Sequence, residues 1–120
     1  MTPTARSLAY LRAQGYHAYV VERWIPQARV RKDVAGFMDI LAWSVDHGPD
    51  QPAITLAVQA TTGANLSARQ RKIECGGLTV SEYEAFEGWK ACGHKVCIHG
   101  WAKQGARGKR KLWTLREVWV

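Results

Sequence analysis

Residues 36–42 have the sequence Gly-Phe-Met-Asp-Ile-Leu-Ala, and residues 56–62 have the sequence Leu-Ala-Val-Gln-Ala-Thr-Thr. Both are short apolar runs, which predict two strands buried in a sheet. Each run holds a polar side chain, Asp39 in the first and Gln59 in the second. A buried carboxylate without a partner is unfavourable by several kcal/mol, and a bound metal ion is a common partner. Strand alternation places Gln59 and Thr61 on the same face.

The composition predicts one folded, basic domain. The chain has 120 residues, which corresponds to a single domain, 1–120, with one core. A hydrophobic content of 47% and six Trp argue against disorder. Lys and Arg number 17 against 10 Asp and Glu, a formal net charge of +7. This balance favours polyanionic partners, nucleic acid first, although a basic surface also serves solubility alone.

The cellular compartment is predicted from targeting segments and from the number of cysteines. The N-terminal residues contain no apolar signal segment, and no apolar run approaches the ~20 residues that span a bilayer. Three Cys is an odd count, which favours reduced thiols. We therefore expect a cytoplasmic protein.

Periodicity and turn residues predict the order of elements. Helices are predicted at 4–14, 64–75 and 81–92; strands at 16–24, 37–45, 54–61, 95–101 and 111–120; loops at 25–35 and 102–111; and a turn at 47–52. A capping box at 81–84, with Val80 and Ala85 as a hydrophobic staple, is expected to start the last helix.

The connections between these elements predict the fold class. The first three strands are joined closely enough to be antiparallel neighbours, whereas the helical crossover allows the fourth strand to enter the same sheet in parallel. The expected fold is therefore α/β, a mixed central β-sheet flanked by helices.

This order and the two apolar runs resemble the PD-(D/E)XK, or restriction-endonuclease-like, nuclease superfamily with its αβββαβ core. The stretch 36–42 is similar to the Gly-x-x-Asp-apolar strand of that family, and 58–61, Val-Gln-Ala-Thr, lies where the family has [Glu/Gln]-x-Lys. The chain also resembles small phage and prophage proteins of the Holliday-junction-resolvase-like branch, over most of its length. Expression in a bacterial cell or a phage-infected host would follow from that resemblance.

The resemblance implies a metal site. Asp39 would be the principal ligand of a divalent ion, and Gln59 would bind through its amide oxygen. Mg²⁺ or Mn²⁺ suits such an oxygen site, with waters completing the octahedron. The ion would orient a hydrolytic water and lower its pKa. The alternative is that Asp39 caps a loop or pairs with an Arg.

Two further carboxylates are candidate ligands. Glu22 ends the first predicted strand, and family members often add a Glu near the N-terminus as an accessory ligand. It would otherwise pair with Arg23 or Arg31. Asp33 precedes Gly36 in a basic loop and is either a second ligand or a turn cap.

Thr61 departs from the family pattern, because it occupies the position of the catalytic Lys. A Thr hydroxyl carries no charge and cannot replace the electrostatic role of that Lys. Either Lys72 or Arg69 of the following helix supplies the charge, or the site binds metal or DNA without cutting.

Cys92, His94, Cys97 and His99 are spaced unlike any common zinc motif. Strand alternation makes Cys97 and His99 neighbours on one face and leaves Cys92 at a helix end. We expect buried thiols here rather than a zinc site or a nucleophile.

Two basic clusters are candidate DNA contacts. One lies at 103–111 and contains Lys103, Arg107, Lys109, Arg110 and Lys111 among glycines. The other contains Arg23, Arg29, Arg31 and Lys32, and Arg69 on the helix predicted at 64–75 is a further candidate. Dense charge on flexible backbone suits phosphate contacts, and the alternative is a solvated loop. Trp101 and Trp113 beside 103–111 are expected in the core or in a hairpin pair rather than as base-stacking platforms.

The sequence therefore predicts a metal-dependent DNA endonuclease, acting on branched or junction DNA. One subunit offers one site, so cutting both strands calls for a homodimer. The rival interpretation is a catalytically inactive module of the same fold that binds DNA or a host factor.

Overall fold

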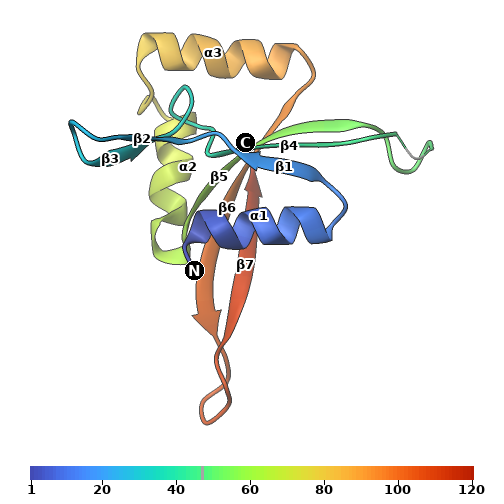
Figure 1. Cartoon of the computed structure of the whole chain (residues 1–120), viewed down its shortest axis with the longest axis vertical. Helices are drawn as coiled ribbons and strands as arrows, with labels where there is room; N and C mark the ends of the chain where they lie inside the picture. Colours follow the sequence, from blue (N-terminus) through green and yellow to red (C-terminus); the bar gives the residue numbers. More distant parts are fainter. Residues whose placement is uncertain (47) are drawn as a thin grey trace.

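The computed structural model describes residues 1–46 and 48–120 (Figure 1). Along the chain the elements are α1 (Pro3–Ala13), β1 (His17–Val20), β2 (Arg23–Ile25), β3 (Val30–Lys32), β4 (Ile40–Ser44), β5 (Ile54–Thr62), the short 3₁₀ helix η1 (Gly63–Asn65), α2 (Leu66–Glu74), α3 (Val80–Ala91), β6 (Lys95–Gln104) and β7 (Leu112–Trp119). No helix among the described residues has the length and apolar character needed to cross a membrane.

Within the described residues, five strands form one mixed sheet in the order β1-β4-β5-β6-β7. Only the central pair β5–β6 is parallel in this sheet, and the other described pairs are antiparallel. The antiparallel pair β4–β5 is joined by a short connection, whereas the parallel pair needs the long crossover through α2 and α3. The expected α/β class with a mixed sheet flanked by helices is confirmed.

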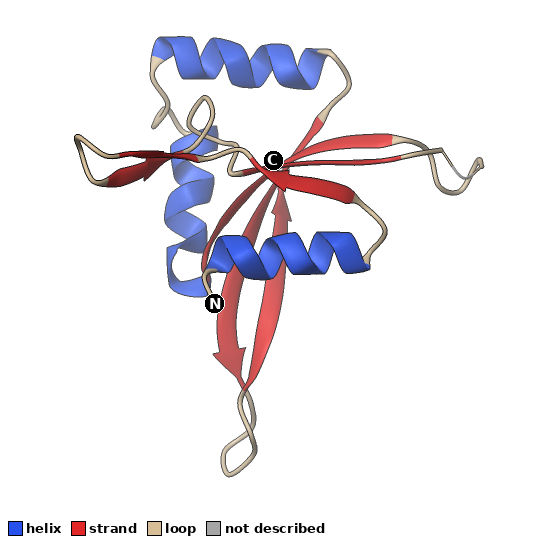
Figure 2. Ribbon diagram, viewed as in Figure 1, coloured by secondary structure: helices blue, strands red, loops and turns tan. Residues whose placement is uncertain are grey.

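The helices cover both faces of the sheet (Figure 2). On one face Leu11 of α1 packs with Ile40, Leu56 and Val58. The other face carries a second core to which α2, α3 and the segment before β4 contribute; its buried members are Phe37, Met38, Ala57, Leu66, Ile73, Phe86, Val96 and Ile98. Because both faces are covered, β5 is a nearly continuous apolar run rather than an alternating one.

The N-terminal part of the sheet differs from the prediction. The single strand expected at 16–24 is divided into β1 and β2, because the N–H groups of Val21 and Glu22 both donate to the Asp39 carbonyl, at 2.9 and 3.2 Å. The chain then leaves the sheet, and 25–35, expected as a loop, contains part of the separate β2–β3 hairpin.

The strand expected at 37–45 begins only at Ile40. Residues 34–38 form a tight loop in which Val34 and Met38 exchange backbone hydrogen bonds of 2.8 and 3.1 Å. Gly36 has a φ of 79° there, and a Cβ at this position would collide with the Glu82 carboxylate. The glycine that begins the 36–42 run is thus favoured by its backbone conformation, and its lack of a side chain leaves room for the Glu82 carboxylate.

The start of α3 also differs from the prediction. The N-cap is Thr79 rather than Ser81, since the Thr79 hydroxyl accepts from Glu82 N at 3.1 Å and the Glu82 carboxylate accepts from Thr79 N at 2.9 Å. The staple expected from Val80 is wrong as well, because that side chain is 77% exposed.

Other boundaries shift by a few residues. Strand β6 continues to Gln104, so the loop expected at 102–111 shortens at its N-terminal side, and the long β6–β7 hairpin projects beyond the helices at the bottom of Figure 1. In the turn expected at 47–52, His47 lies outside the described residues, and Gln51 N donates to Gly48 O at 3.1 Å.

Candidate functional site

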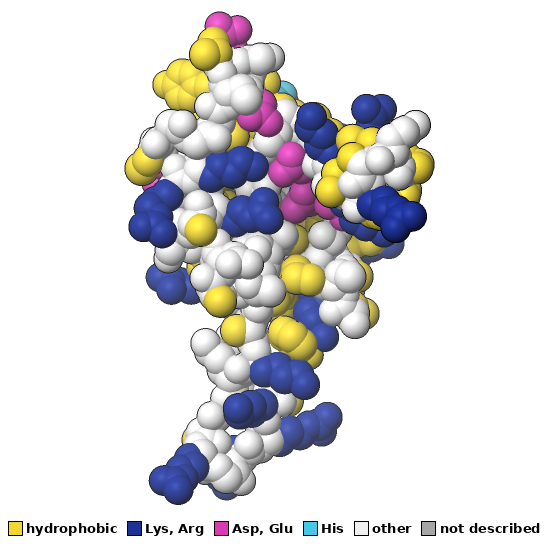
Figure 3. All heavy atoms as spheres, turned by 90° about the vertical axis from the view of Figure 1, so that its left-hand side faces the viewer, with side chains coloured by type: hydrophobic (Ala, Val, Ile, Leu, Met, Phe, Trp, Pro, Cys, Tyr) yellow, Lys and Arg dark blue, Asp and Glu magenta, His cyan; other side chains and the backbone are white. Residues whose placement is uncertain are grey.

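A polar cleft of about 360 Å³ lies where α1, the β2–β3 hairpin, β5 and α2 meet. Its lining residues are Thr4, Glu22, Arg31, Lys32, Asp33, Asp39, Ala60, Arg69 and Lys72. We call it the carboxylate cleft, because three acidic side chains line it. Figure 3 shows acidic side chains at the centre of this face with Lys and Arg on both sides.

Asp39 is held by hydrogen bonds to two neighbouring segments. Its N–H donates to Val58 O at 2.9 Å, and its Oδ2 accepts from Ala60 N at 2.9 Å. Its carbonyl accepts the two bonds from Val21 N and Glu22 N that end β1. The side chain is only 6% exposed, so this network, rather than solvent, determines its position.

The electrostatics of the cleft disfavour a charged Asp39 in the absence of a cation. Burial raises the pKa of Asp39 to about 7, and the negative charges of Glu22 and Asp33 add to that rise. The hydrogen bond from Ala60 N and the charge of Arg69 oppose it. A divalent cation would reverse this balance, because it stabilises the ionised carboxylate.

Gln59 lies between the two residues of β5 that bond to Asp39, and its side chain is fully buried. Its Nε2 donates to Asp33 Oδ2 at 2.6 Å. That donor–carboxylate contact assigns the orientation of the amide, since the flipped orientation would place two acceptors together. Gln59 Oε1 then has no hydrogen-bond partner among the described residues, an unfavourable state for a buried acceptor. Gln59 does not itself line the cleft, and it is connected to the cleft through its bond to Asp33.

Glu22 occupies the rim of the cleft. Its side chain is 12% exposed, and its Oε1 lies 3.9 Å from Nη1 of Arg31, whose side chain is 64% exposed. The pairing with Arg31 that the sequence allowed as an alternative is therefore present, at the long end of the range. A pair of this length, with its Arg31 exposed to solvent, contributes little stability, so it leaves Glu22 available to a cation.

Thr61 is buried against β6 opposite Gly100 and does not line the carboxylate cleft. Arg69 and Lys72 do line it, one helical turn apart on α2. The positive charges of the cleft thus come from α2 and from the β2–β3 hairpin, which supplies Arg31 and Lys32.

The remaining basic candidates are spread over two projections. Arg29 lies at the turn of the β2–β3 hairpin with a φ of 51°. Lys103 lies near the end of β6, and Arg107, Lys109, Arg110 and Lys111 follow in the connection to β7. Figure 3 shows Lys and Arg gathered on this lower projection as well as around the cleft.

The two tryptophans beside that projection have structural contacts. Trp101 is buried and donates to the Ser7 hydroxyl at 2.8 Å. Trp113 pairs with Lys103 across the hairpin, and the Arg6 guanidinium lies 3.7 Å from its ring centroid. Their positions agree with the core and hairpin roles expected for them.

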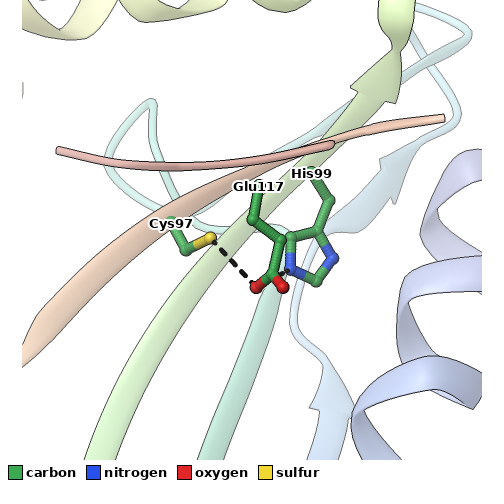
Figure 4. A group of neighbouring side chains, drawn as sticks. All are labelled: Cys97, His99 and Glu117. Atoms are coloured by element: carbon green, nitrogen blue, oxygen red, sulfur yellow. Dashed lines mark hydrogen bonds and ion pairs between the residues drawn. The ribbon is translucent and has the colours of Figure 1, made fainter. Parts of the chain in front are cut away.

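The Cys/His cluster divides in two. Cys92 is exposed at the end of α3, and the His94 ring packs 4.5 Å from that of Trp89. Cys97 and His99 are buried side by side on β6, as strand alternation predicts, and Glu117 of β7 joins them (Figure 4). This group of three could hold a metal ion. The sequence analysis did not predict Glu117 as a member of this group. It would have done so if the register between strands 95–104 and 112–119 had been known, because Glu117 lies opposite His99.

The raised pKa of Asp39 makes stability depend on pH. The pKa in the folded state, about 7, lies above the ordinary value of 3.8, so the folded chain retains a proton that the unfolded chain releases. Stability is then fully present below pH 3.8 and falls as pH rises through 7, by about 1.4 kcal/mol per unit at most. Asp39→Asn should remove this dependence of stability on pH. At pH 8 its free energy of unfolding should exceed that of the parent by on the order of 4 kcal/mol at most.

Urea unfolding at pH 4.5 and 8, in buffer with a chelator, measures this difference. The variant is compared with its parent at each pH, so the titrations of other groups cancel. An equal difference at the two pH values would show that Asp39 does not carry a raised pKa.

Comparisons with protein-family models, with curated proteins and with solved structures found no match to this chain. The resemblance to the PD-(D/E)XK superfamily therefore depends only on the residues of this chain, chiefly the two apolar runs that contain Asp39 and Gln59.

Proposed function

We propose that this chain is a metal-dependent DNA endonuclease that hydrolyses phosphodiester bonds, with the carboxylate cleft as its active site. The observation that carries the proposal is a buried Gln59 whose Nε2 bonds to Asp33 of the cleft and whose Oε1 has no hydrogen-bond partner, within the part of the chain that the structure describes. An acceptor without a donor, next to carboxylates that repel one another, fits a bound cation better than it fits a purely structural role.

The donor set indicates the class of cation. Glu22, Asp33, Asp39 and Gln59 offer oxygen atoms, which suit Mg²⁺ or Mn²⁺ with several retained waters. When bound, the ion supplies a water of lowered pKa and shields the charge of the phosphate. Asp39 and Asp33 would hold the ion, Gln59 would add a neutral ligand, and Glu22 would reach it from the rim.

The positive side chains of the cleft supply what Thr61 cannot. Lys72 and Arg69 line the same cleft as the carboxylates, so a phosphate seated there meets both charges. They would stabilise the charge that develops on the phosphate oxygens in the transition state. Arg31 and Lys32 on one side, and the basic hairpin of residues 103–111 on the other, would hold the backbone of the DNA.

The substrate is proposed to be branched or junction DNA, cut by a homodimer, since the described residues of one chain form one such cleft and two incisions require two. The second candidate function is a DNA-binding or host-factor-binding module without catalysis. The observation that favours it is the buried Thr61 in place of a charged Lys. Divalent-ion-dependent cleavage of a four-way junction by the purified chain distinguishes the two.

Asp39→Asn should abolish Mn²⁺ binding, because it removes the carboxylate charge at the centre of the cleft while its amide oxygen still accepts from Ala60 N. Isothermal titration calorimetry with Mn²⁺ measures this loss. Asp50→Asn, an exposed change near the start of β5, is the matched control and should bind as the parent does. Equal affinity in the Asp39 variant and the parent would show that Asp39 is not a ligand.

Lys72→Ala should lose cleavage by on the order of 10²–10³ in rate while keeping most of its DNA affinity, because it removes one charge positioned at the reacting phosphate. Arg71→Ala, on the exposed side of the same helix, is the control and should cleave normally. Single-turnover cleavage and anisotropy on the same junction give both quantities. If the parent is inert and Thr61→Lys creates activity, the non-catalytic module is the correct assignment.

Neutralising Lys109, Arg110 and Lys111 together should weaken binding similarly for unrelated sequences, because the basic hairpin is expected to touch phosphates rather than bases. On duplex DNA, the slope of log K against log salt should fall by about 0.9 for each phosphate that the variant no longer neutralises. Fluorescence anisotropy over a salt series, on duplex and junction DNA, measures it.

The matched control neutralises Lys90 and Lys95, which lie at the opposite end of β6 from the basic hairpin. It should leave the slope unchanged. A triple variant with the parental slope would show that the hairpin is a solvated loop.

A further inference from the structure

A second group of ligand-type side chains lies under α1, apart from the carboxylate cleft. Cys97 and His99 come from β6, and Glu117 comes from β7, where it is directly opposite His99. His99 Nε2 lies 3.3 Å from Glu117 Oε2, and Cys97 Sγ lies 3.7 Å from the same oxygen (Figure 4). One ligand atom from each residue falls within 4.8 Å of the other two.

We propose that Cys97, His99 and Glu117 form a binding site for a thiophilic transition-metal ion, Zn²⁺ first. Around tetrahedral zinc, bonds of about 2.0–2.3 Å place neighbouring ligand atoms about 3.3–3.6 Å apart. The two distances to Glu117 Oε2 are close to these edges, so an ion could be bound with little rearrangement of the backbone.

Binding of the ion would displace one proton from the three side chains. The thiol of Cys97 and the ring of His99 both point at one carboxylate oxygen, where an ion would take the place of the thiol proton. That proton leaves to solvent. The ring proton of neutral His99 would move from Nε2, where it faces Glu117, to Nδ1, where it faces Ser7 Oγ, so that Nε2 becomes the ligand atom.

The surrounding side chains support the ligands in the manner of a built metal site. Ser7 Oγ lies 2.9 Å from His99 Nδ1 and accepts from Trp101 Nε1 at 2.8 Å. Tyr10 donates to the second carboxylate oxygen of Glu117 at 3.2 Å. Partners of this kind orient ligating histidines and carboxylates in metal sites generally.

An ion can reach the group from solvent. The Glu117 side chain is 31% exposed and lines a cleft of about 310 Å³ between α1 and β7, together with Tyr10, Tyr16 and Trp119. Three protein ligands leave a fourth position for water, which would face this cleft. Since Ser7 and Tyr10 belong to α1, the ion would also attach α1 more firmly to the β6–β7 hairpin.

Ligand chemistry separates this site from the carboxylate cleft. A thiolate and an imidazole select soft or borderline ions such as Zn²⁺ and Co²⁺, whereas the all-oxygen cleft selects Mg²⁺ or Mn²⁺. The inference does not depend on the proposed nuclease function, and Asp39→Asn should leave this second site intact.

Cobalt titration tests the site directly. Cys75→Ser combined with Cys92→Ser changes two exposed thiols and leaves Cys97 as the only one of the three Cys in the chain. Reduced, metal-free protein carrying this pair should take up one equivalent of Co²⁺ with a thiolate-to-cobalt charge-transfer band and the intense visible bands of a tetrahedral ion. Zn²⁺ should displace these bands and raise the melting temperature.

A ligand variant and its control complete the test. Glu117→Gln on the same background should weaken Co²⁺ binding by about 10-fold or more, since loss of a ligand should cost at least as much as loss of a supporting residue. Glu87→Gln on exposed α3 should have no effect. Absence of the charge-transfer band in the Cys97-only protein, or unchanged affinity in Glu117→Gln, would overturn the proposal.

Discussion

The hydrogen bonds around Asp39 connect the parts of the molecule on which everything else depends. Its main chain accepts from Val21 and Glu22 at the end of β1 and donates to Val58 of β5, and its side chain accepts from Ala60. One residue therefore joins the edge strand, the centre of the sheet and the point where the chain leaves for the β2–β3 hairpin. The free energy lost by burying its carboxylate is offset only while those segments stay in place or a cation is bound.

This junction explains why the acidic residues converge although they are distant in sequence. The two bonds to the Asp39 carbonyl end β1, and Glu22 follows at once on the rim of the cleft. The hairpin that leaves the sheet there returns with Asp33, which Gln59 holds through its amide. The same interruption of the sheet that divides the predicted first strand thus creates the cleft.

Local patterns in the sequence were sufficient for some features and not for others. Asp39 and Gln59 stood out because polar residues in buried apolar runs are rare, and the crossover followed from the helix between β5 and β6. The placement of Cys97 and His99 on the same face of a strand followed from strand alternation alone.

The division of the strand predicted at 16–24 into two could not be predicted, because it depends on hydrogen bonds from Val21 and Glu22 to Asp39, which lies next to another strand. Thr79 was missed because Thr79–Glu82 and Ser81–Glu84 both have the spacing of a capping box, and only the structure shows that the reciprocal bonds form in the first. Predicting that Glu117 lies opposite His99 would have required the register of the β6–β7 hairpin, whose strands are joined by a charged loop.

The parallel pairing of β5 with β6 has a consequence for how the molecule assembles. The β4–β5 and β6–β7 hairpins are local in sequence, whereas β5 and β6 meet only after the chain through α2 and α3 has closed on itself. Loop closure of that length carries an entropic cost that must be met before the contacts form, so we expect this pairing to limit the folding rate. Arg69 and Lys72 lie on the crossover between β5 and β6, whereas the three carboxylates, Arg31 and Lys32 precede β5 in the chain. Two of the four positive charges of the cleft would therefore arrive late in folding, and a chain still emerging from the ribosome would hold the three carboxylates with Arg31 and Lys32 alone.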